Sequence, residues 1–289
     1  MKKFGVLLML LSFSIIIGCS KNSDDDPPKP IDKSGNLLAT GDSAEDILSN
    51  GNFSKIQVEI AFVTGFKPAE EAMNEFVAYL KRRTFKQEVE LIFKELPSPN
   101  EEDLTLEEID DLEKENRTIY NDGETLAIYI YFADAPAEDD DEEEGLVTLG
   151  AVYRNTSMVI HEVTVRKLAN LSSLISVADV EGATINHEFG HLFGLVNLGT
   201  DPINDHEDTE AENHCNVNGC LMRAELQFGG SGKSATNTAG KYDKGLKSAC
   251  SLSGQSMLHM LQLQSAKESA ALPTLDAECI LDLQGNGGK

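Results

Sequence analysis

The chain has 289 residues, of which 40% are hydrophobic, an ordinary share for a globular protein. This length suffices for one large domain or two small ones with a sizeable core. Its 24 Lys and Arg residues against 49 Asp and Glu residues give a formal net charge of −25. Nucleic acids and anionic lipid surfaces both require a basic protein face, so this acidity argues against binding either of them.

The first twenty residues have the pattern of a bacterial export signal. Lys2 and Lys3 precede an apolar run over residues 6–17, which is too short to cross about 30 Å of hydrocarbon. The segment that ends at Cys19 resembles a lipobox, in which cleavage before the cysteine leaves it carrying acyl chains. We therefore expect residues 1–18 to be a lipoprotein signal peptide and Cys19 to anchor the protein to a lipid bilayer.

The polar, Pro-rich residues that follow Cys19 offer little apolar surface to bury. We expect residues 19–50 to form a disordered tether and residues 51–289 to form the folded domain, with subdomains at 51–196 and 197–289. The run Asp24–Asp26 resembles signals that send Gram-negative lipoproteins to the cell surface, although it also fits a solvated spacer. The expected location is the outer membrane, on its periplasmic face or at the cell surface.

Strands and helices alternate along the folded domain. Apolar side chains that alternate with polar ones, or that run nearly continuously, predict strands at 55–63, 88–93 and 126–132 and a weaker pair within 145–160. Helical spacing of apolar residues predicts helices at 69–83 and 105–118. This order indicates an α/β (α+β) fold with a twisted, mostly parallel sheet of about five strands and an antiparallel edge strand.

The stretch with the strongest chemical signal lies in a predicted helix over residues 177–195. His187 and His191 are four residues apart, so they project from one face of the helix a single turn apart. This separation lets two imidazole nitrogens reach one Zn²⁺ at about 2.0–2.1 Å. Glu188 lies about 100° round the helix, where it can act on a water molecule at the metal. The pattern predicts a zinc site with Glu188 as general base.

A catalytic zinc ion needs a third protein ligand, with its fourth position left open. Gly194 can adopt a positive φ at no steric cost, which would end the helix and turn the chain back toward the metal. Two histidines downstream, His206 and His214, could then supply the third ligand. The residues alone leave both open.

Residues 187–194 match the first part of the metzincin pattern, H-E-x-x-H-x-x-G-x-x-H, but the ligand position after the glycine holds Asn197. The sequence HCNVNGCLM at 214–222 resembles the block that follows in archaemetzincins. This resemblance implies that His214 is the third zinc ligand, that Met222 forms the Met-turn beneath the metal, and that residues 197–213 are an insertion. It also implies a metzincin-like fold with an active-site helix and a C-terminal helical subdomain.

The four cysteines beyond Cys19 are Cys215, Cys220, Cys250 and Cys279. In an oxidising compartment they could form two disulfides by any of three connectivities, and proximity in the sequence favours Cys215–Cys220 and Cys250–Cys279. Archaemetzincins add a Cys-x-x-Cys that completes a second, four-cysteine zinc site. This chain has no such pair, so we expect one Zn²⁺.

The chain looks like a bacterial lipoprotein zinc metallopeptidase, which would hydrolyse peptides or proteins as a monomer. An extended substrate would pair with the edge strand within 146–160. The alternative is a catalytically inactive surface-binding lipoprotein on a metzincin scaffold, which Asn197 motivates. The acidic segments 138–144 and 197–213 are expected to be solvated loops; the first could instead bind calcium, and the second could cap the cleft.

Overall fold

A computed structural model describes residues 31–141, 147–171, 173, 175–224 and 272–289. The chain divides into a unit of residues 1–31 and a unit of residues 32–289, and the description below concerns the second unit. The predicted signal peptide, the predicted acylation site Cys19 and the predicted disulfide partner Cys250 lie outside the described residues. Within the described residues, no helix combines the length and the apolarity that a membrane span requires.

The centre of the fold is a five-stranded sheet with the strand order β2-β1-β3-β5-β4. The strands are β1 (Lys55–Val63), β2 (Glu88–Leu96), β3 (Thr125–Ala133), β4 (Gly150–Arg154) and β5 (Ser157–His161). Four strands run parallel, and the edge strand β4 is antiparallel to β5. The predicted mostly parallel sheet with an antiparallel edge strand is therefore confirmed.

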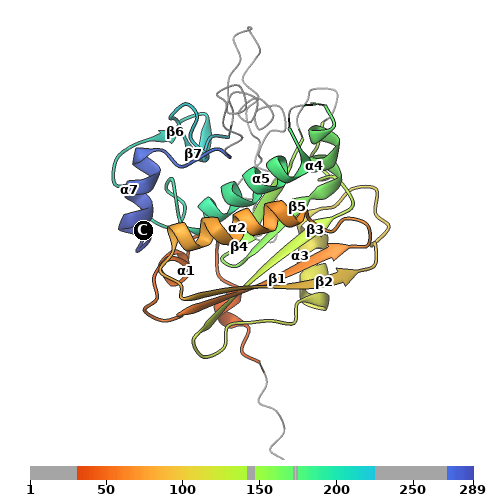
Figure 1. The fold of residues 1–289 in the computed structure, drawn as a ribbon, viewed down its shortest axis with the longest axis horizontal. Coiled ribbons are helices and arrows are strands. Elements are labelled where there is room, and N and C mark those ends of the chain that lie inside the picture. Colours follow the sequence, from red (N-terminus) through yellow and green to blue (C-terminus); the bar gives the residue numbers. More distant parts are fainter. Residues whose placement is uncertain (1–30, 142–146, 172, 174, 225–271) are drawn as a thin grey trace, which may run out of the picture. The chain divides into compact units, whose positions relative to one another are not determined.

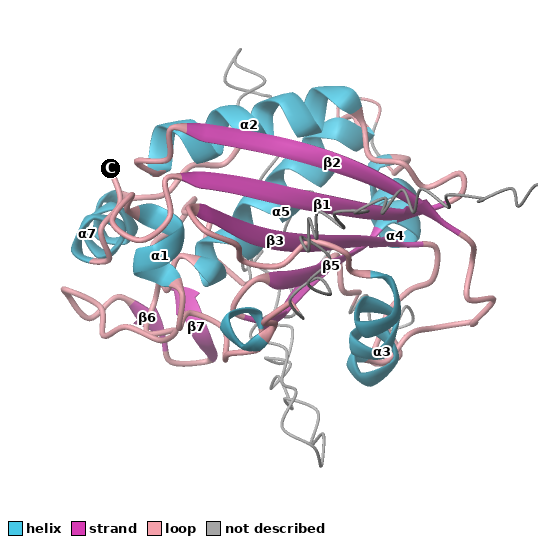
Figure 2. Ribbon diagram, turned by 90° about the horizontal axis from the view of Figure 1, so that it is seen from below, coloured by secondary structure: helices cyan, strands magenta, loops and turns pink. Residues whose placement is uncertain are grey.

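Helices cover both faces of the sheet, as Figures 1 and 2 show. One face packs against α2 (Glu70–Arg83), α4 (Glu162–Ala169) and α5 (Val177–Leu192), and the other packs against α3 (Leu106–Asn116). The central strand β3 is buried along nearly its whole length, which explains its almost continuous apolar sequence. The predicted helices at 69–83, 105–118 and 177–195 are present as α2, α3 and α5, while α4 was not predicted.

The prediction of a disordered tether over residues 19–50 is wrong for its second half. A 3-10 helix η1 (Ser34–Asn36) and a helix α1 (Ala44–Leu48) occupy this segment, and Ile47 and Leu48 are fully buried. The side chain of Asn36 donates to the Ala127 carbonyl oxygen at 3.0 Å and accepts from the Asn121 backbone N–H at 2.9 Å. A few separated side chains thus attach the segment to the core. Because such contacts produce no periodic pattern of apolar residues in the sequence, the sequence analysis did not detect them.

The C-terminal part of the described chain contains a small hairpin and one helix. The hairpin pairs β6 (Glu207–Asp208) with β7 (Ala211–Cys215), and the helix is α7 (Ala277–Gly285). The hairpin begins within the insertion expected to be a solvated loop and ends beyond it at Cys215, so this part of the insertion is a hairpin, with half-buried and exposed residues up to Asn213. Of the predicted C-terminal helical subdomain, α7 is the part that the described residues include.

Two buried carboxyl groups meet where α4 packs on α5. Glu162 and Glu181 are both fully buried, and among the described residues Oε2 of Glu162 and Oε1 of Glu181 have no hydrogen-bond partner. Burial, and next the neighbouring Glu181, raise the pKa of Glu162 to about 9. Glu181 also accepts from the backbone N–H of Ala69 at 2.8 Å, and Glu162 from the side chain of Arg166 at 2.6 Å.

We predict that Asn36→Ala lowers the free energy of unfolding by about 1–3 kcal/mol, because it leaves buried backbone groups without partners. Chemical denaturation of the purified protein measures this. The exposed Asn52 provides the matched control, and Asn52→Ala should change stability by less than about 0.5 kcal/mol. Equal effects of the two substitutions would contradict the attachment described here.

We predict that Glu162→Gln makes the stability less dependent on pH. Above the ordinary carboxyl pKa of about 4.5 the unfolded chain loses its Glu162 proton, whereas the folded chain keeps it up to about pH 9. Unfolding then releases a proton, so the free energy of unfolding falls as the pH rises through this window. Denaturation from pH 5 to 9 should show a shallower decline in the variant, and parallel declines would contradict a proton held on Glu162 in the folded chain.

Candidate active site

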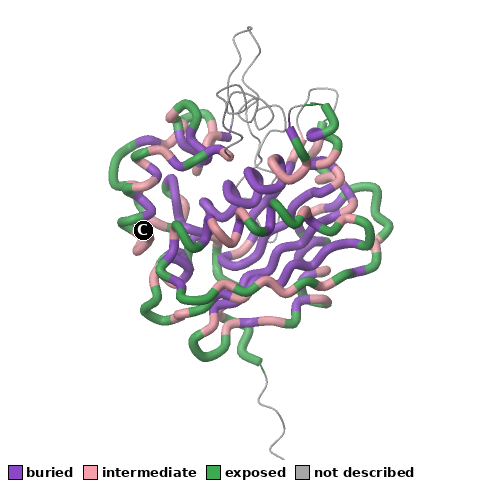
Figure 3. Tube along the Cα trace, viewed as in Figure 1, coloured by how far each residue is buried: buried purple, intermediate pink, exposed green. Residues whose placement is uncertain are grey.

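The helix α5 holds the predicted zinc motif in a buried and well-defined position. It begins at a capping box, in which Ser176 accepts from the backbone N–H of Asp179 at 3.2 Å and the Asp179 side chain accepts from the Ser176 N–H at 2.8 Å. Every residue from 180 to 192 is buried, and Figure 3 shows this helix as a continuous buried segment. Side chains on such a helix have little freedom to move.

Three histidines meet at the C-terminal half of α5. The Nε2 atoms of His187 and His191 are 3.2 Å apart, and the His214 ring centroid lies 5.4 Å and 5.0 Å from theirs. One ring nitrogen from each residue lies within 4.8 Å of the others, and none of the three is more than 2% exposed. A tetrahedral zinc ion with nitrogens at 2.0–2.1 Å keeps two of them about 3.4 Å apart, so these residues fit the ion.

The third histidine comes from the hairpin. Successive side chains of a strand point to opposite sides, and accordingly His214 on β7 joins the helix pair while the next residue, Cys215, points to a different cluster. Asn197, at the ligand position of the metzincin pattern, instead donates to Glu207 at 3.0 Å. Gly194 has a φ of 72°, as predicted for the residue that turns the chain at the end of the helix.

Hydrogen bonds orient two of the rings. The Nδ1 atom of His187 lies 2.7 Å from the Leu221 carbonyl oxygen, and that of His214 lies 2.8 Å from the Glu212 carbonyl oxygen. A ring that donates from Nδ1 to a carbonyl presents Nε2 as a lone-pair donor, which is how metal-binding histidines are commonly held.

The three rings are uncharged at neutral pH. Burial lowers the pKa of His187 to about 3 and that of His214 to about 4, and it holds the pKa of His191 well below its ordinary value. A metal ion binds neutral imidazole and competes with protons for it. The cluster is therefore already in the protonation state that a metal requires.

Two glycines that the sequence analysis did not single out shape this region. A Cβ atom on Gly150 of β4 would lie 3.0 Å from Cγ and 3.2 Å from Oε1 of Glu188, so the edge strand passes directly against the predicted general base. A side chain at Gly190 would overlap the sulfur of Met222, which is fully buried. The predicted Met-turn residue thus packs against α5 at Gly190, the residue before His191.

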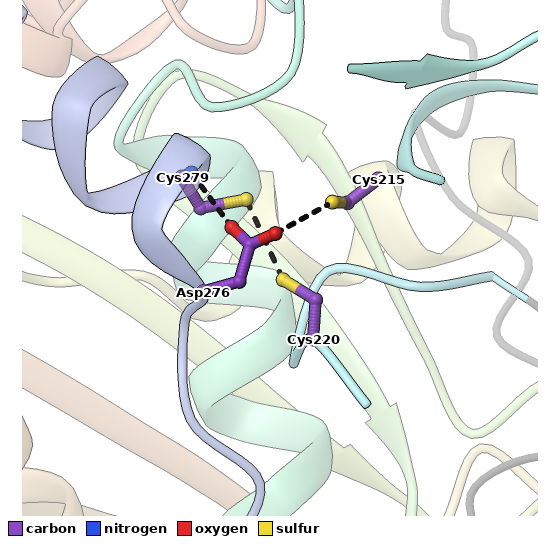
Figure 4. A group of neighbouring side chains, drawn as sticks. All are labelled: Cys215, Cys220, Asp276 and Cys279. Carbon is purple, nitrogen blue, oxygen red and sulfur yellow. Dashed lines mark hydrogen bonds between the residues drawn. The ribbon is translucent and has the colours of Figure 1, made fainter. Parts of the chain in front are cut away.

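A second cluster of metal-ligand type lies beside the first (Figure 4). It consists of three buried cysteines and one aspartate, Cys215, Cys220, Cys279 and Asp276, whose ligand atoms lie within 4.8 Å of one another. The sulfurs of Cys220 and Cys279 are 3.5 Å apart, and the sulfur of Cys215 lies 3.5 Å from Asp276 Oδ2. The three cysteines are free thiols.

In the described residues Cys215, Cys220 and Cys279 are thus free, so the structure does not contain the predicted Cys215–Cys220 disulfide; Cys250, the predicted partner of Cys279, lies outside the described residues. Proximity in sequence suggested both disulfides, whereas α7 brings Cys279 to the loop of Cys215 and Cys220 across more than fifty residues. The sequence signal that could have revealed this cluster is D-x-x-C at residues 276–279. A carboxylate is also a zinc ligand, so Asp276 can occupy the position that a first cysteine would have in Cys-x-x-Cys.

The second cluster also fits an ion. A tetrahedral zinc ion keeps two thiolate sulfurs about 3.8 Å apart and a sulfur and a carboxylate oxygen about 3.6 Å apart, close to the separations in this cluster. Hydrogen bonds from Cys215 and Cys279 lower the pKa of Cys220 to about 5. One thiolate, the form that binds metals, is thus present at neutral pH.

His206, the alternative third ligand, lies away from the histidine cluster. Its Nε2 is 2.7 Å from Asp282 Oδ2 and its Nδ1 is 3.4 Å from the sulfur of Cys215. Burial lowers the pKa of His206, but the bonds with Cys215 and Asp282 outweigh this effect and the net shift is upward. The structure thus brings His214, and not His206, to the helix pair.

We predict that Gly150→Ala lowers kcat of any Glu188-dependent reaction by about tenfold or more while the histidine cluster keeps its metal. The added Cβ must push Glu188 and Thr184 aside by a few tenths of an ångström, and small misplacements of a catalytic group are costly. Activity and metal content are measured together. Gly51→Ala is the control, because a Cβ at this exposed glycine would make only an ordinary contact of 3.6 Å with Ser49 Oγ. Unchanged activity in Gly150→Ala would contradict the contact.

No protein-family model matches the chain, and no curated protein matches it by sequence. Among solved structures, the crystal structure of archaemetzincin from Methanopyrus kandleri matches over 82% of this chain and 96% of that chain. The identity is 14% and the TM-score is 0.42. This chain is thus similar to an archaemetzincin, a degree of likeness that identifies neither ligands nor an activity in it.

Proposed function

We propose that this protein is a zinc-dependent endopeptidase. One observation carries the proposal: three buried, neutral imidazoles, those of His187, His191 and His214, converge on one point, and Glu188 is the residue next to the first of them. Three protein ligands leave a fourth position open, which distinguishes a catalytic zinc site from a structural one. A histidine cluster used only for structure would not require a buried carboxylate beside it.

Each residue has a defined task in the proposed reaction. A bound zinc ion would supply Lewis-acid chemistry, which activates water at neutral pH and polarises a peptide carbonyl. Glu188 takes a proton from the attacking water and gives it to the departing amine. The backbone carbonyls of Leu221 and Glu212 hold the rings of His187 and His214 in orientation.

The edge strand β4 is the proposed binding surface for substrate. Among the described residues it pairs with β5 on one side only, so its other edge can add an extended peptide as a further strand. Gly150 brings this strand against Glu188. A peptide paired with β4 would therefore run past the general base.

A second ion, held by Cys215, Cys220, Asp276 and Cys279, is part of the proposal and revises the expectation of one Zn²⁺. Four protein ligands complete a tetrahedral shell, so this ion would be structural. The remaining expectations, export as a lipoprotein acylated at Cys19, location at the outer membrane, a monomeric state and a peptide or protein substrate, are also proposals. The alternative of an inactive binding lipoprotein rested on Asn197, and the position of His214 beside His187 and His191 supports the peptidase instead.

We predict that Glu188→Gln lowers the hydrolysis of casein or a fluorogenic peptide by about 10²–10⁴-fold, because the amide cannot accept the proton from water. The variant should keep its zinc, since Glu188 is not in the histidine cluster. Metal analysis accompanies the assay, and Glu101→Gln, at an exposed position, serves as the control. Full hydrolysis by the zinc-loaded Glu188→Gln variant would refute the peptidase.

A further inference from the structure

The residues that the metzincin pattern does not account for, 197–213, are connected to the second cluster. Within this insertion, His206 lies between the Asp282 carboxylate on α7, at 2.7 Å, and the sulfur of Cys215 on β7, at 3.4 Å. His206 is 2% exposed and Asp282 is 3% exposed. A buried histidine with both ring nitrogens occupied in this way bridges two elements that the sequence separates widely.

The bridge is reinforced by the backbone on either side. The second oxygen of Asp282 accepts from the N–H of Ile203 at 2.7 Å, and the carbonyl oxygen of His206 accepts from the N–H of Asn216 at 2.8 Å. One carboxylate thus holds the insertion at two points, and the insertion in turn holds the residue after Cys215. These contacts join the insertion to residues of, or next to, the second cluster, called the thiol cluster below, and none of them involves His187, His191 or His214.

We propose that the insertion exists to supply His206 as a positioning residue for the ion of the thiol cluster. In this role His206 does not bind the ion; it holds the sulfur of Cys215 in place, and Asp282 holds His206. Partners of this kind commonly set the orientation of a metal ligand, and their loss costs about 10–100-fold in metal affinity. The inference rests on the second ion proposed above.

The bridge also bears on the histidine cluster. Cys215 directly follows His214, and its backbone N–H donates to the Met222 carbonyl oxygen at 2.8 Å. Movement of Cys215 would therefore carry His214 with it. The insertion thus stabilises the third histidine indirectly, by fixing the neighbouring sulfur.

Asp282, His206 and Cys215 also allow a second interpretation, because a cysteine that contacts a histidine supported by an aspartate is the arrangement of a catalytic thiol nucleophile. Two observations oppose that reading. Cys215 is fully buried, and its sulfur lies in a cluster with two further thiols and a carboxylate. The variants below separate the two readings.

The test uses the full chain loaded with Zn²⁺ or Co²⁺ and three variants of the bridge. His206→Gln keeps a donor near Asp282 but loses the one near Cys215, His206→Asn does the reverse, and Asp282→Asn weakens the support of His206. Asn204→Ala is the matched control, because Asn204 also joins the insertion to α7, through Glu278 at 2.7 Å, at an exposed place away from the sulfurs. The measurements are zinc stoichiometry, the rate of zinc release to a chelator, and the thiolate-to-cobalt charge-transfer absorption.

The expected result is that His206→Gln releases the thiol-bound ion about 10–100-fold faster and alters the cobalt absorption. His206→Asn and Asp282→Asn should show smaller losses, and Asn204→Ala should behave as the unmodified chain. If His206→Gln releases the thiol-bound zinc as slowly as the unmodified chain does, the positioning role of His206 is wrong but the second ion is not. If the unmodified chain binds only one zinc equivalent, both the second ion and the role of His206 are wrong, and the peptidase is still tested by the Glu188 variant.

A third outcome would favour the nucleophile reading. If His206→Gln keeps both ions tightly bound but loses peptide hydrolysis, and a thiol reagent inhibits the unmodified chain, then His206 serves Cys215 as a base and the positioning role is wrong.

Discussion

The alternation of side chains along β7 is the constraint on which both clusters depend. Because consecutive residues of a strand point to opposite sides, His214 reaches the two helix histidines while Cys215 reaches two thiols and a carboxylate. The loop after β7 also contributes to both clusters: the Leu221 carbonyl oxygen lies against the ring of His187, and Cys220 belongs to the thiol cluster. A shift of one residue in this strand would exchange the two side chains and dismantle both clusters at once.

Burying so many polar groups is costly unless each of them is neutral or paired. The histidines meet this condition by staying uncharged, since burial lowers their pKa values far below neutrality. The thiol cluster meets it through hydrogen bonds among its own members. Perturbed groups gathered around one buried helix are typical of functional sites, and this is the strongest physical reason to regard α5 as more than a core helix.

Close packing around α5 depends on residues without side chains. Gly150 lets the edge strand approach Glu188, and Gly190 makes room for the sulfur of Met222 on another side of the helix. These contacts place the edge strand against Glu188 and the methionine against Gly190, two residues inside the motif. In the sequence the motif at residues 187–191 is only a spacing. In the structure its side chains have fixed positions, because β4 and Met222 pack tightly against the helix that carries it.

The sequence by itself determined the strands of the five-stranded sheet, the helix α5 and the pair His187 and His191, because each depends on periodicity within a short segment. It left both His206 and His214 open as the third ligand until a family resemblance favoured His214, and it did not bring Cys279 together with Cys215 and Cys220. It also missed the buried contacts of Asn36 and the ligand character of Asp276. The third histidine, the cysteine cluster, the contacts of Asn36 and the role of Asp276 all depend on which distant segments pack together, as α7 packs beside β7. The spacing of residues along the chain does not indicate this packing. Tertiary structure alone decided these features, since burial and contact between remote residues arise only when the core forms.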